Sequence, residues 1–522
     1  MARILVVEDD PDQLEMRKLI LEHAGYQVAA AQNATEALDQ LPGCQLVVMD
    51  LRLPTPEDGL RLIEAASGSA KIVVLSGDAE TGLPVDEFLT KPCSSKKLLE
   101  TIARFCMLLI AMLITMSAGL RAGSFTVSRT SEVVAELDMR AVGTDWSEEG
   151  REARLATLVL DGEPQQQVML YAGAEQFTYT VFLGKIAAGE HRLDYSGQGV
   201  ELIAARFRED SSDVLANAPV FYARANTIGK FTDIPLVLYC ERLSENGNPF
   251  LQYTLIFSNE DGGTSTRALM ARWGRTSDVE YVYRAFLNAD GSVRRATIQV
   301  EGHKEKEFGG RRDGSHPLLL PVTDNNMIGE VDQPNATRYQ IAPVLVDLAG
   351  HSREEVMDQH PITYKIMTKE LKREGKLRPS GTVDGEKVSD PRNYLYFELQ
   401  LGRSESSVGT LVRLKGNPRW YSSHLGHADF AIRTWKRNSA ESPDGFVRTT
   451  VELPPGTKPE QIAEIGFECV VPEKAESDSN CRVEAVTKCF FLDREYTPDT
   501  NVWSSTAPHD IPAGTIWTSA LK

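Results

Sequence analysis

Short apolar runs alternate with amphipathic stretches over residues 1–105, and this alternation restricts the fold more than any other feature of the chain. The apolar runs are Arg3–Val7, Gln45–Met49 and Lys71–Leu75. Pro11–Ala24 has apolar residues at helical spacing, and Gly25 follows it where a helix commonly ends on glycine. Strands that alternate with helices predict a parallel sheet covered by helices on both faces, which is a doubly wound α/β fold.

Polar residues that carry phosphoryl-transfer chemistry follow the predicted strands. Glu8 and Asp9 end the first run, Asp50 and Ser76 end the next two, and Lys91 follows a further short run. The carboxyl ends of parallel strands face one crevice, where ligands bind. Three carboxylates there need a cation, and Mg²⁺ prefers such oxygen ligands. A carboxylate nucleophile, a metal, a hydroxyl and an ammonium group together predict phosphoryl transfer.

Four segments in order resemble the signature segments of response-regulator receiver domains. They are Ile4–Asp10 (ILVVEDD), Val48–Pro54 (VMDLRLP), Val74–Gly77 (VLSG) and Phe88–Pro92 (FLTKP). The resemblance covers about a fifth of the chain, residues 1–105, and implies a flavodoxin-like fold. It also implies a two-component phosphorelay, in which the partner is a sensor histidine kinase or a phosphotransfer protein.

The resemblance assigns a role to each residue of the acidic crevice. Asp50 takes the phosphoryl group from a phosphohistidine. Mg²⁺ is bound by Asp9, by Asp50 and by the backbone carbonyl of Arg52, with Glu8 acting through water. Lys91 contacts a phosphoryl oxygen.

A second set of roles concerns the switch of the receiver between its unphosphorylated and phosphorylated states. The resemblance implies that Ser76 moves to bond the phosphoryl group and that Phe88 repacks when it does. It also implies a cis Lys91–Pro92 bond. The chain between Ser76 and Lys91 is several residues shorter than is usual for the family, and the loop between Pro54 and Gly59 is about one residue longer. The shortening falls on the fourth helix and predicts a changed output surface.

Residues 106–122 form a hydrophobic segment with no charged residue before Arg121, for which three interpretations stand. Phe105–Leu120 as a helix would span roughly 24 Å, slightly less than a ~30 Å hydrocarbon core. A single-pass membrane anchor would leave residues 1–105 in the cytoplasm and place those after about 122 in the periplasm or outside the cell. A signal peptide starting at Met107 is the second interpretation, and it would make the chain a fusion of a receiver with a secreted protein. A buried extension of the preceding helix is the third.

The remainder of the chain changes to a period of two, which predicts a mainly-β sandwich or jelly-roll architecture. We expect a β-sandwich module over residues 123–210, a linker at Arg208–Asp213, and β-rich domains over 211–522. One helix is expected near residues 352–375, because Ser352 and Glu355 have capping-box spacing.

Function is harder to predict for this larger part. It has no G-x-S-x-G, H-E-x-x-H or P-loop motif, so whether it is an enzyme stays open. The loops Ser258–Thr264 and Arg272–Asp278 are rich in carboxylates, arginines and an aromatic, and are interpreted as polar turns or as a calcium or sugar site. His424 and His427 have H-x-x-H spacing, interpreted as a metal site or as ordinary polar residues. The segment Val181–Leu193 resembles strand–turn–strand pieces of accessory modules in exported carbohydrate-active proteins.

Charge and cysteine content bear on compartment and partners. The net charge of −18 argues against nucleic acid as a partner. Cys240, Cys469, Cys481 and Cys489 form an even set that can pair if that part of the chain is exported. Two functions therefore compete: a Mg²⁺-dependent phosphoacceptor, and a secreted β-sandwich protein that binds or degrades carbohydrate.

Overall fold

The fold is described from a computed structural model. The described residues are 3–24, 26–51, 53, 55–66, 70–76, 85–91, 93–95, 97–99, 101–102, 105, 121–224, 234–260, 264–331, 337–380, 387–433, 445–471 and 479–521.

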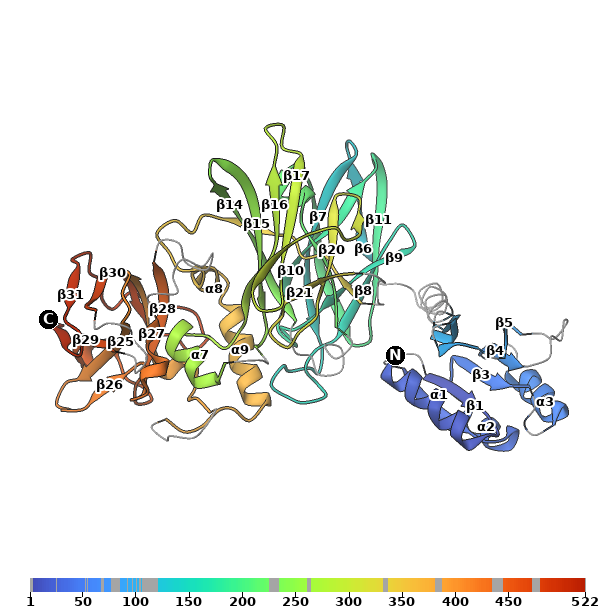
Figure 1. The fold of residues 1–522 in the computed structure, drawn as a ribbon. Coiled ribbons are helices and arrows are strands. Elements are labelled where there is room, and N and C mark those ends of the chain that lie inside the picture. The colour runs from blue at the N-terminus through green and yellow to red at the C-terminus, as the bar shows by residue number, and fades with distance from the viewer. Residues whose placement is uncertain are drawn as a thin grey trace.

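The N-terminal part contains a five-stranded parallel sheet with the order β2-β1-β3-β4-β5 (Figure 1). Its strands are β1 (Arg3–Val7), β2 (Gln27–Ala31), β3 (Leu46–Asp50), β4 (Lys71–Ser76) and β5 (Glu87–Thr90). The helices between them are α1 (Pro11–His23), α2 (Ala34–Gln40) and α3 (Pro56–Ala66). This strand order is that of flavodoxin-like doubly wound sheets, so the predicted fold of this part is confirmed.

Both faces of the parallel sheet are buried, which explains why its strands read as continuous apolar runs. Along β1, Ile4 and Val6 pack in one apolar cluster with residues of α1. Leu5 and Val7 point to the opposite face and pack in a second cluster with residues of α2 and α3. All four side chains are fully buried. Successive side chains of a strand point to opposite faces of the sheet, so each strand contributes residues to both apolar clusters.

Helix α1 begins where the carboxyl edge of the sheet ends. Asp10 is its N-cap, and Asp10 Oδ1 accepts hydrogen bonds from the backbone N–H groups of Asp12 at 2.9 Å and Gln13 at 3.2 Å. The helix ends at His23, with Ala24 as C-cap. The predicted terminating glycine, Gly25, lies outside the described residues.

The predicted hydrophobic segment, residues 106–122, lies outside the described residues apart from its last two, with which β6 begins. None of the helices in the described ranges is both long and apolar enough to cross a membrane. The three interpretations of this segment therefore stay predictions.

The described residues from 121 onwards are mostly antiparallel β-structure, as predicted. Residues 121–210 form a three-stranded sheet, β10-β7-β12, and a four-stranded sheet, β6-β11-β8-β9. Their strands are β6 (Arg121–Val127), β7 (Ser131–Ala141), β8 (Leu155–Leu160), β9 (Glu163–Met169), β10 (Phe177–Ile186), β11 (Gly189–Ser196) and β12 (Val200–Asp210). β10 and β11 belong to different sheets, so Val181–Leu193 turns a corner between two sheets and does not form a hairpin.

Two further sheets follow. The first has the strand order β19-β20-β13-β22, with β21 paired to β20. The second has the strand order β18-β17-β16-β15-β14-β23. The strands of the first are β13 (Val220–Tyr222), β19 (Arg312–Asp313), β20 (His316–Pro321), β21 (Ile328–Glu330) and β22 (Arg338–Tyr339). Those of the second are β14 (Pro235–Glu245), β15 (Asn248–Phe257), β16 (Val279–Leu287), β17 (Val293–Val300), β18 (Lys304–Glu307) and β23 (Val344–Val346). The short helices α5 (Asp213–Ala216) and α7 (Thr266–Trp273) lie in the same part of the chain.

The last two sheets have the orders β28-β24-β30-β31 and β26-β25-β29-β32, with β27 on β25. Their strands are β24 (Tyr394–Leu401), β25 (Ser407–Leu414), β26 (Trp420–Ser422), β27 (Ile432–Arg433), β28 (Phe446–Glu452), β29 (Ile462–Val470), β30 (Cys481–Phe490), β31 (His509–Ile511) and β32 (Ile516–Ala520).

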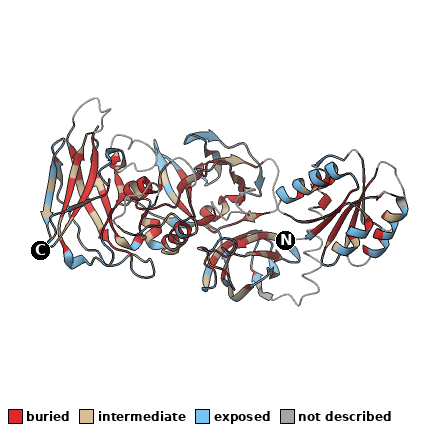
Figure 2. Cartoon of the chain, turned by 90° about the horizontal axis from the view of Figure 1, so that it is seen from below, coloured by how far each residue is buried: buried red, intermediate tan, exposed pale blue. Residues whose placement is uncertain are grey.

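Two apolar clusters hold these sheets together, and buried residues follow the strands throughout (Figure 2). The larger cluster runs from Val127 to Leu492 and includes residues on both sides of position 210. The smaller cluster runs from Leu395 to Ile511 and fills the space between the last two sheets. The buried residues on either side of the predicted linker at Arg208–Asp213 are therefore packed together.

The helix expected near residues 352–375 is divided into α8 (Glu355–Gln359) and α9 (Ile362–Arg373). Pro361 separates them, because proline has no N–H group to continue the hydrogen bonding of a helix. The predicted capping box is wrong, since Glu354 is the N-cap of α8 and makes no side-chain cap bond. Ser352 Oγ instead donates to Glu398 Oε2 at 2.9 Å.

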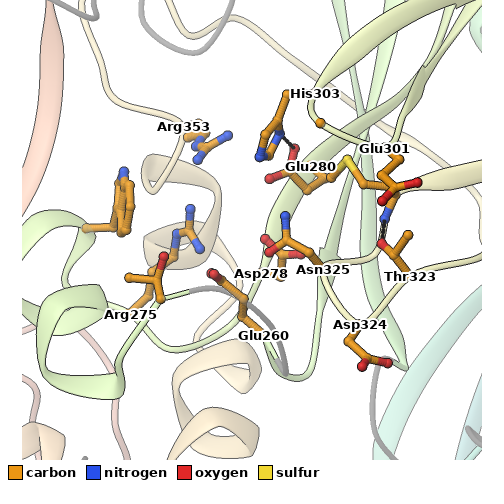
Figure 3. Close-up of a pocket in the computed structure, with 14 residues that line it drawn as sticks. Glu260, Arg275, Asp278, Glu280, Glu301, His303, Thr323, Asp324, Asn325 and Arg353 are labelled. Atoms are coloured by element: carbon orange, nitrogen blue, oxygen red, sulfur yellow. Dashed lines mark hydrogen bonds and ion pairs between the residues drawn. The ribbon is translucent and has the colours of Figure 1, made fainter.

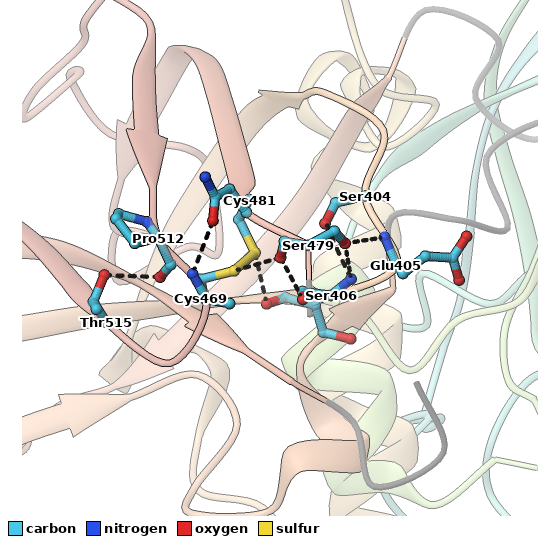
Figure 4. The surroundings of a disulfide bond; sticks show 11 residues. Ser404, Glu405, Ser406, Cys469, Ser479, Cys481, Pro512 and Thr515 are labelled. Carbon is cyan, nitrogen blue, oxygen red and sulfur yellow. Dashed lines mark hydrogen bonds between the residues drawn. A yellow bond between two sulfur atoms is a disulfide. The ribbon is translucent and has the colours of Figure 1, made fainter. Parts of the chain in front are cut away.

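A disulfide joins the last two sheets (Figure 4). Cys469 on β29 and Cys481 on β30 are bonded, with their Cα atoms 5.4 Å apart. Cys240 and Cys489, the other members of the predicted even set, are buried free thiols. Only one of the two bonds that the even set permits is therefore formed.

Candidate functional site

The candidate site lies at the carboxyl edge of the parallel sheet. Glu8 and Asp9 follow β1, Asp50 and Ser76 are the last residues of β3 and β4, and Lys91 follows β5. The strands β1, β3, β4 and β5 are neighbours in that order. Their ends therefore bring Glu8 and Lys91 into contact, although the two residues are 83 positions apart in the chain. The parallel topology thus assembles the group that the sequence predicts.

Lys91 lies at the centre of this group. Its Nζ donates to Asp50 Oδ2 at 2.6 Å and to Glu8 Oε2 at 3.4 Å. Carboxylate oxygens of Glu8, Asp9 and Asp50 all lie within 4.8 Å of one another. Glu8 is buried, Asp50 is partly exposed and Asp9 is exposed, so the group is open to solvent on the side of Asp9.

The charge of the crevice suits a divalent cation. Glu8, Asp9 and Asp50 supply three carboxylates, and the cations Lys91 and Arg17 contact two of them, which leaves one negative charge. Clustered carboxylate oxygens that keep solvent access are the donors that Mg²⁺ takes, because this ion retains several waters. The residues present therefore fit this metal.

Arg17 is a member of the site that sequence reasoning missed. Its guanidinium group donates to Glu8 Oε2, and both side chains are almost fully buried. The spacing of residues in the sequence indicated that Arg17 is buried. Leu14, Arg17 and Leu21 share one helical face and are the buried residues of α1. An arginine in an apolar stripe needs an acidic partner.

The predicted switch residues lie on the two strands next to the acidic group. Ser76 is buried, and its carbonyl accepts a hydrogen bond from the backbone N–H of Lys91 at 2.8 Å. Phe88 on β5 pairs with Val74 on β4 and packs, partly buried, against the cluster beside α2 and α3. The end of β4 is thus linked to the backbone of the lysine that contacts Asp50.

Several predicted features lie outside the described residues: Arg52, Pro92 with its cis bond, and the shortened segment at 77–84. The carbonyl ligand, the isomer and the changed output surface therefore stay predictions.

Outside this crevice, one more group of possible metal ligands occurs within the described ranges: His351, Glu355 and Glu398. Cations already neutralise its acids, since Lys488 contacts Glu355 and Arg448 lies 3.3 Å from Glu398. The H-x-x-H pair is not brought together as a metal site either. His424 Nε2 is 3.0 Å from Glu468, whereas the ring of His427 contacts Phe430.

A doubly wound sheet with an acidic crevice and a lysine at its carboxyl edge defines the class of receiver proteins. The family model of the response regulator receiver domain matches residues 4–103. Through these residues the chain belongs to the response regulator receiver domain family.

Individual relatives match between a fifth and about a quarter of the chain. The cell cycle transcriptional regulator CtrA of Caulobacter vibrioides is 28% identical over 151 residues, which are 27% of this chain and 61% of the relative. An uncharacterized 14.6 kDa protein of Leptolyngbya boryana is 32% identical over 120 residues, which are 20% of this chain and 89% of the relative. A solved receiver domain structure from Methanospirillum hungatei is 30% identical, with a TM-score of 0.19, and the match covers 20% of this chain and 92% of that one. The chain thus spans about three-fifths of the length of the CtrA relative.

Proposed function

We propose that Asp50 accepts a phosphoryl group from a phosphohistidine of a sensor histidine kinase or a phosphotransfer protein. The observation that supports this best is the contact of Lys91 Nζ with Asp50 Oδ2 at 2.6 Å, beside two further carboxylates within 4.8 Å. Receiver domains generally act with such partners and with Mg²⁺, and they are typically cytoplasmic.

In the proposed reaction a carboxylate oxygen of Asp50 attacks the phosphorus atom. The new P–O bond forms as the P–N bond to the donor histidine breaks, and the imidazole leaves with the electron pair of that bond. Lys91 then contacts a phosphoryl oxygen and offsets its charge. Bound Mg²⁺ would supply further charge neutralisation, held by Asp9, Asp50 and the carbonyl of Arg52, with Glu8 acting through water.

Replacing Asp9 by Asn is expected to weaken Mg²⁺ binding about tenfold or more, because the variant removes one anionic oxygen ligand. Titration calorimetry of the unphosphorylated full chain with MgCl₂ measures this without any phosphoryl donor. Asp12→Asn is the matched control, since Asp12 is an exposed acid on α1 and is not one of the clustered carboxylates. Equal Mg²⁺ affinity of the Asp9→Asn variant and the wild type would contradict the assignment.

Phosphorylation would act on binding through Ser76 and Phe88. In this proposal Ser76 bonds a phosphoryl oxygen and the ring of Phe88 repacks, which favours one of two states with different surfaces. The backbone bond between Lys91 and Ser76 gives a physical link between these two residues and the site.

A second candidate function belongs to residues 123–522, which we propose to be an exported β-rich region directed at carbohydrate. The disulfide Cys469–Cys481 supports export, because such bonds persist in oxidising compartments and are rare in the cytoplasm. In this proposal the chain is divided into a receiver (1–105), a membrane anchor or signal-peptide-like segment (106–122), a β-sandwich module (123–210) and β-rich domains (211–522).

Export predicts a distinct pattern of thiol labelling. When protein taken from cells is denatured without reductant and alkylated, Cys240 and Cys489 are expected to be labelled, whereas Cys469 and Cys481 are not. Mass spectrometry of the peptides measures the labelling. Equal labelling of all four cysteines would argue that this region matures in a reducing compartment.

Fractionated cells, probed with one antibody against residues 1–100 and another against 400–522, distinguish the two ways of joining the parts. A single full-length band in the membrane fraction means an anchored receiver. Two products, a soluble receiver and an exported protein that starts near residue 123, mean a cleaved fusion.

A further inference from the structure

A polar cavity of about 480 Å³ lies in the β-rich region, at the ends of β15, β16 and β17 and beside α7 (Figure 3). It collects residues from both loops that the sequence singles out, including Glu260, Trp273, Arg275 and Asp278. Segments far away in the sequence complete it, among them Arg353 in front of α8. The two loops lie side by side, since the backbone N–H of Glu260 donates to the carbonyl of Thr276 at 3.2 Å, and both contribute residues to the cavity wall.

The cavity wall contains charged side chains that are almost fully buried. Asp278 and Arg275 are each 2% exposed, and Glu280 is 6% exposed. Burying charged groups is unfavourable unless they have partners, so their positions must be fixed by specific contacts. Figure 3 shows Asp278 and Glu280 on one side of the space, and Arg353 across from them.

Amide side chains behind the wall fix the two acids. Asn326 Nδ2 donates to Asp278 Oδ2 at 3.0 Å, and Gln299 Nε2 donates to Glu280 Oε2 at 2.5 Å. Their own oxygens, Asn326 Oδ1 and Gln299 Oε1, are buried and accept no hydrogen bond within the described residues. Unsatisfied buried oxygens are uncommon, and a hydroxyl or water donor is what such atoms need.

Hydrogen bonds also fix the position of the arginine on the basic side of the cavity. Arg275 Nε donates to Glu354 Oε1 at 3.1 Å, which holds the guanidinium group in place, and this group lies 5.8 Å from the centre of the Trp273 ring. Glu260 also lines the cavity, and burial raises the pKa of its carboxyl to about 7. Burial also raises the pKa of Asp278, so both carboxyls are able to carry a proton and donate hydrogen bonds.

From this arrangement we propose that the cavity binds an uncharged saccharide. Its volume lies within the range of ligand pockets, and it offers fixed acceptors, fixed donors and one aromatic side chain. Sugar hydroxyls donate to carboxylates and accept from guanidinium groups, while the apolar C–H face of a sugar packs on an indole ring.

The charge of the wall excludes anionic ligands. Five carboxyl groups and two guanidinium groups line the cavity, and Glu354 already contacts both cations, Arg275 at 3.1 Å and Arg353 at 3.7 Å. A divalent cation alone fits less well, because the acids of this cavity do not form one of the close ligand groups found among the described residues. This inference rests on the second candidate function and is independent of the phosphoacceptor chemistry.

Titration calorimetry of the full chain tests the proposal, with cellotriose, maltotriose, xylotriose and N,N′-diacetylchitobiose as neutral probes and trigalacturonate as the anionic probe. At least one neutral probe is expected to bind and trigalacturonate is not. Trp273→Ala and Asp278→Asn are each expected to weaken binding about tenfold or more, through loss of the aromatic face or of a fixed carboxyl group that hydrogen-bonds a sugar hydroxyl. Glu260→Gln serves as a further variant if thermal melting shows that Asp278→Asn does not fold.

Two variants outside the cavity are the controls. Trp503→Ala removes a tryptophan that packs against the smaller apolar cluster, and Asp290→Asn changes an acid in an exposed turn. Both should bind like the wild type. Binding that all cavity variants retain would overturn the cavity assignment and leave the second candidate function standing. If no neutral probe binds, or if trigalacturonate binds more tightly than the neutral probes, the proposed ligand class, an uncharged saccharide, is overturned together with the cavity assignment.

Discussion

The full chain carrying Asp50→Asn is expected to take up no phosphoryl group from acetyl phosphate in the presence of MgCl₂, whereas the wild type takes up one. An amide has no anionic oxygen to attack phosphorus, and the variant also loses the charged contact with Lys91 at 2.6 Å. The intact mass of the protein, measured before and after incubation, gives the result directly.

Asp10→Asn is the control for this experiment. Asp10 is next to Asp9 in the chain, but its carboxylate caps α1, where the N–H of Gln13 lowers its pKa. We therefore expect this variant to be phosphorylated like the wild type. Equal phosphorylation of Asp50→Asn and the wild type would refute the assignment of the phosphoacceptor.

The second large effect is expected in the β-rich region, where Arg448→Met should lower the free energy of unfolding by about 3–5 kcal/mol, the usual cost of breaking a buried ion pair. Arg448 is fully buried and its guanidinium group donates to both oxygens of Asp358 at 2.9 Å. It also donates to Glu398 at 3.3 Å. Burial raises the pKa of Glu398, but Arg448 and several hydrogen bonds lower it to about 2, so this acid stays ionised and would be left with an uncompensated charge.

Urea denaturation followed by tryptophan fluorescence measures this loss, since all six tryptophans lie after residue 120 and report only on the β-rich region. Arg482→Met is the matched control. Its side chain is 41% exposed and pairs with exposed Asp510, so its loss should cost far less than the loss of Arg448. Similar stabilities of the two variants would show that the buried network contributes little.

The acidic crevice was predictable because its residues sit at fixed places in short, ordered motifs. Asp50 and Lys91 each end or follow an apolar run, and the βαβ pattern dictates that such ends meet. The partner of Glu8 was not foreseen, because the contact of Arg17 depends on how α1 packs over β1. The proposed saccharide cavity shows the same limit in part: the loops that carry Glu260 and Asp278 stood out in the sequence, but Arg353 comes from a distant segment that no local pattern links to them.

The division of the predicted helix at residues 352–375 has a related cause. Ser352 and Glu355 satisfy the capping-box spacing, and the local sequence favours that cap. In the folded chain, however, the hydroxyl of Ser352 donates to the buried carboxylate of Glu398. A buried carboxylate without donors is costly, so the tertiary contact prevails.

The sequence by itself determined the parallel sheet, the acidic crevice at its edge and the β-structure of the larger part, because these follow from the periodicity of apolar residues and from motifs within a few residues. Only the tertiary structure decided which cysteines pair, how the buried arginines are neutralised and where a cavity opens. Those features depend on contacts between residues far apart in the chain, and such contacts are set by how whole sheets pack.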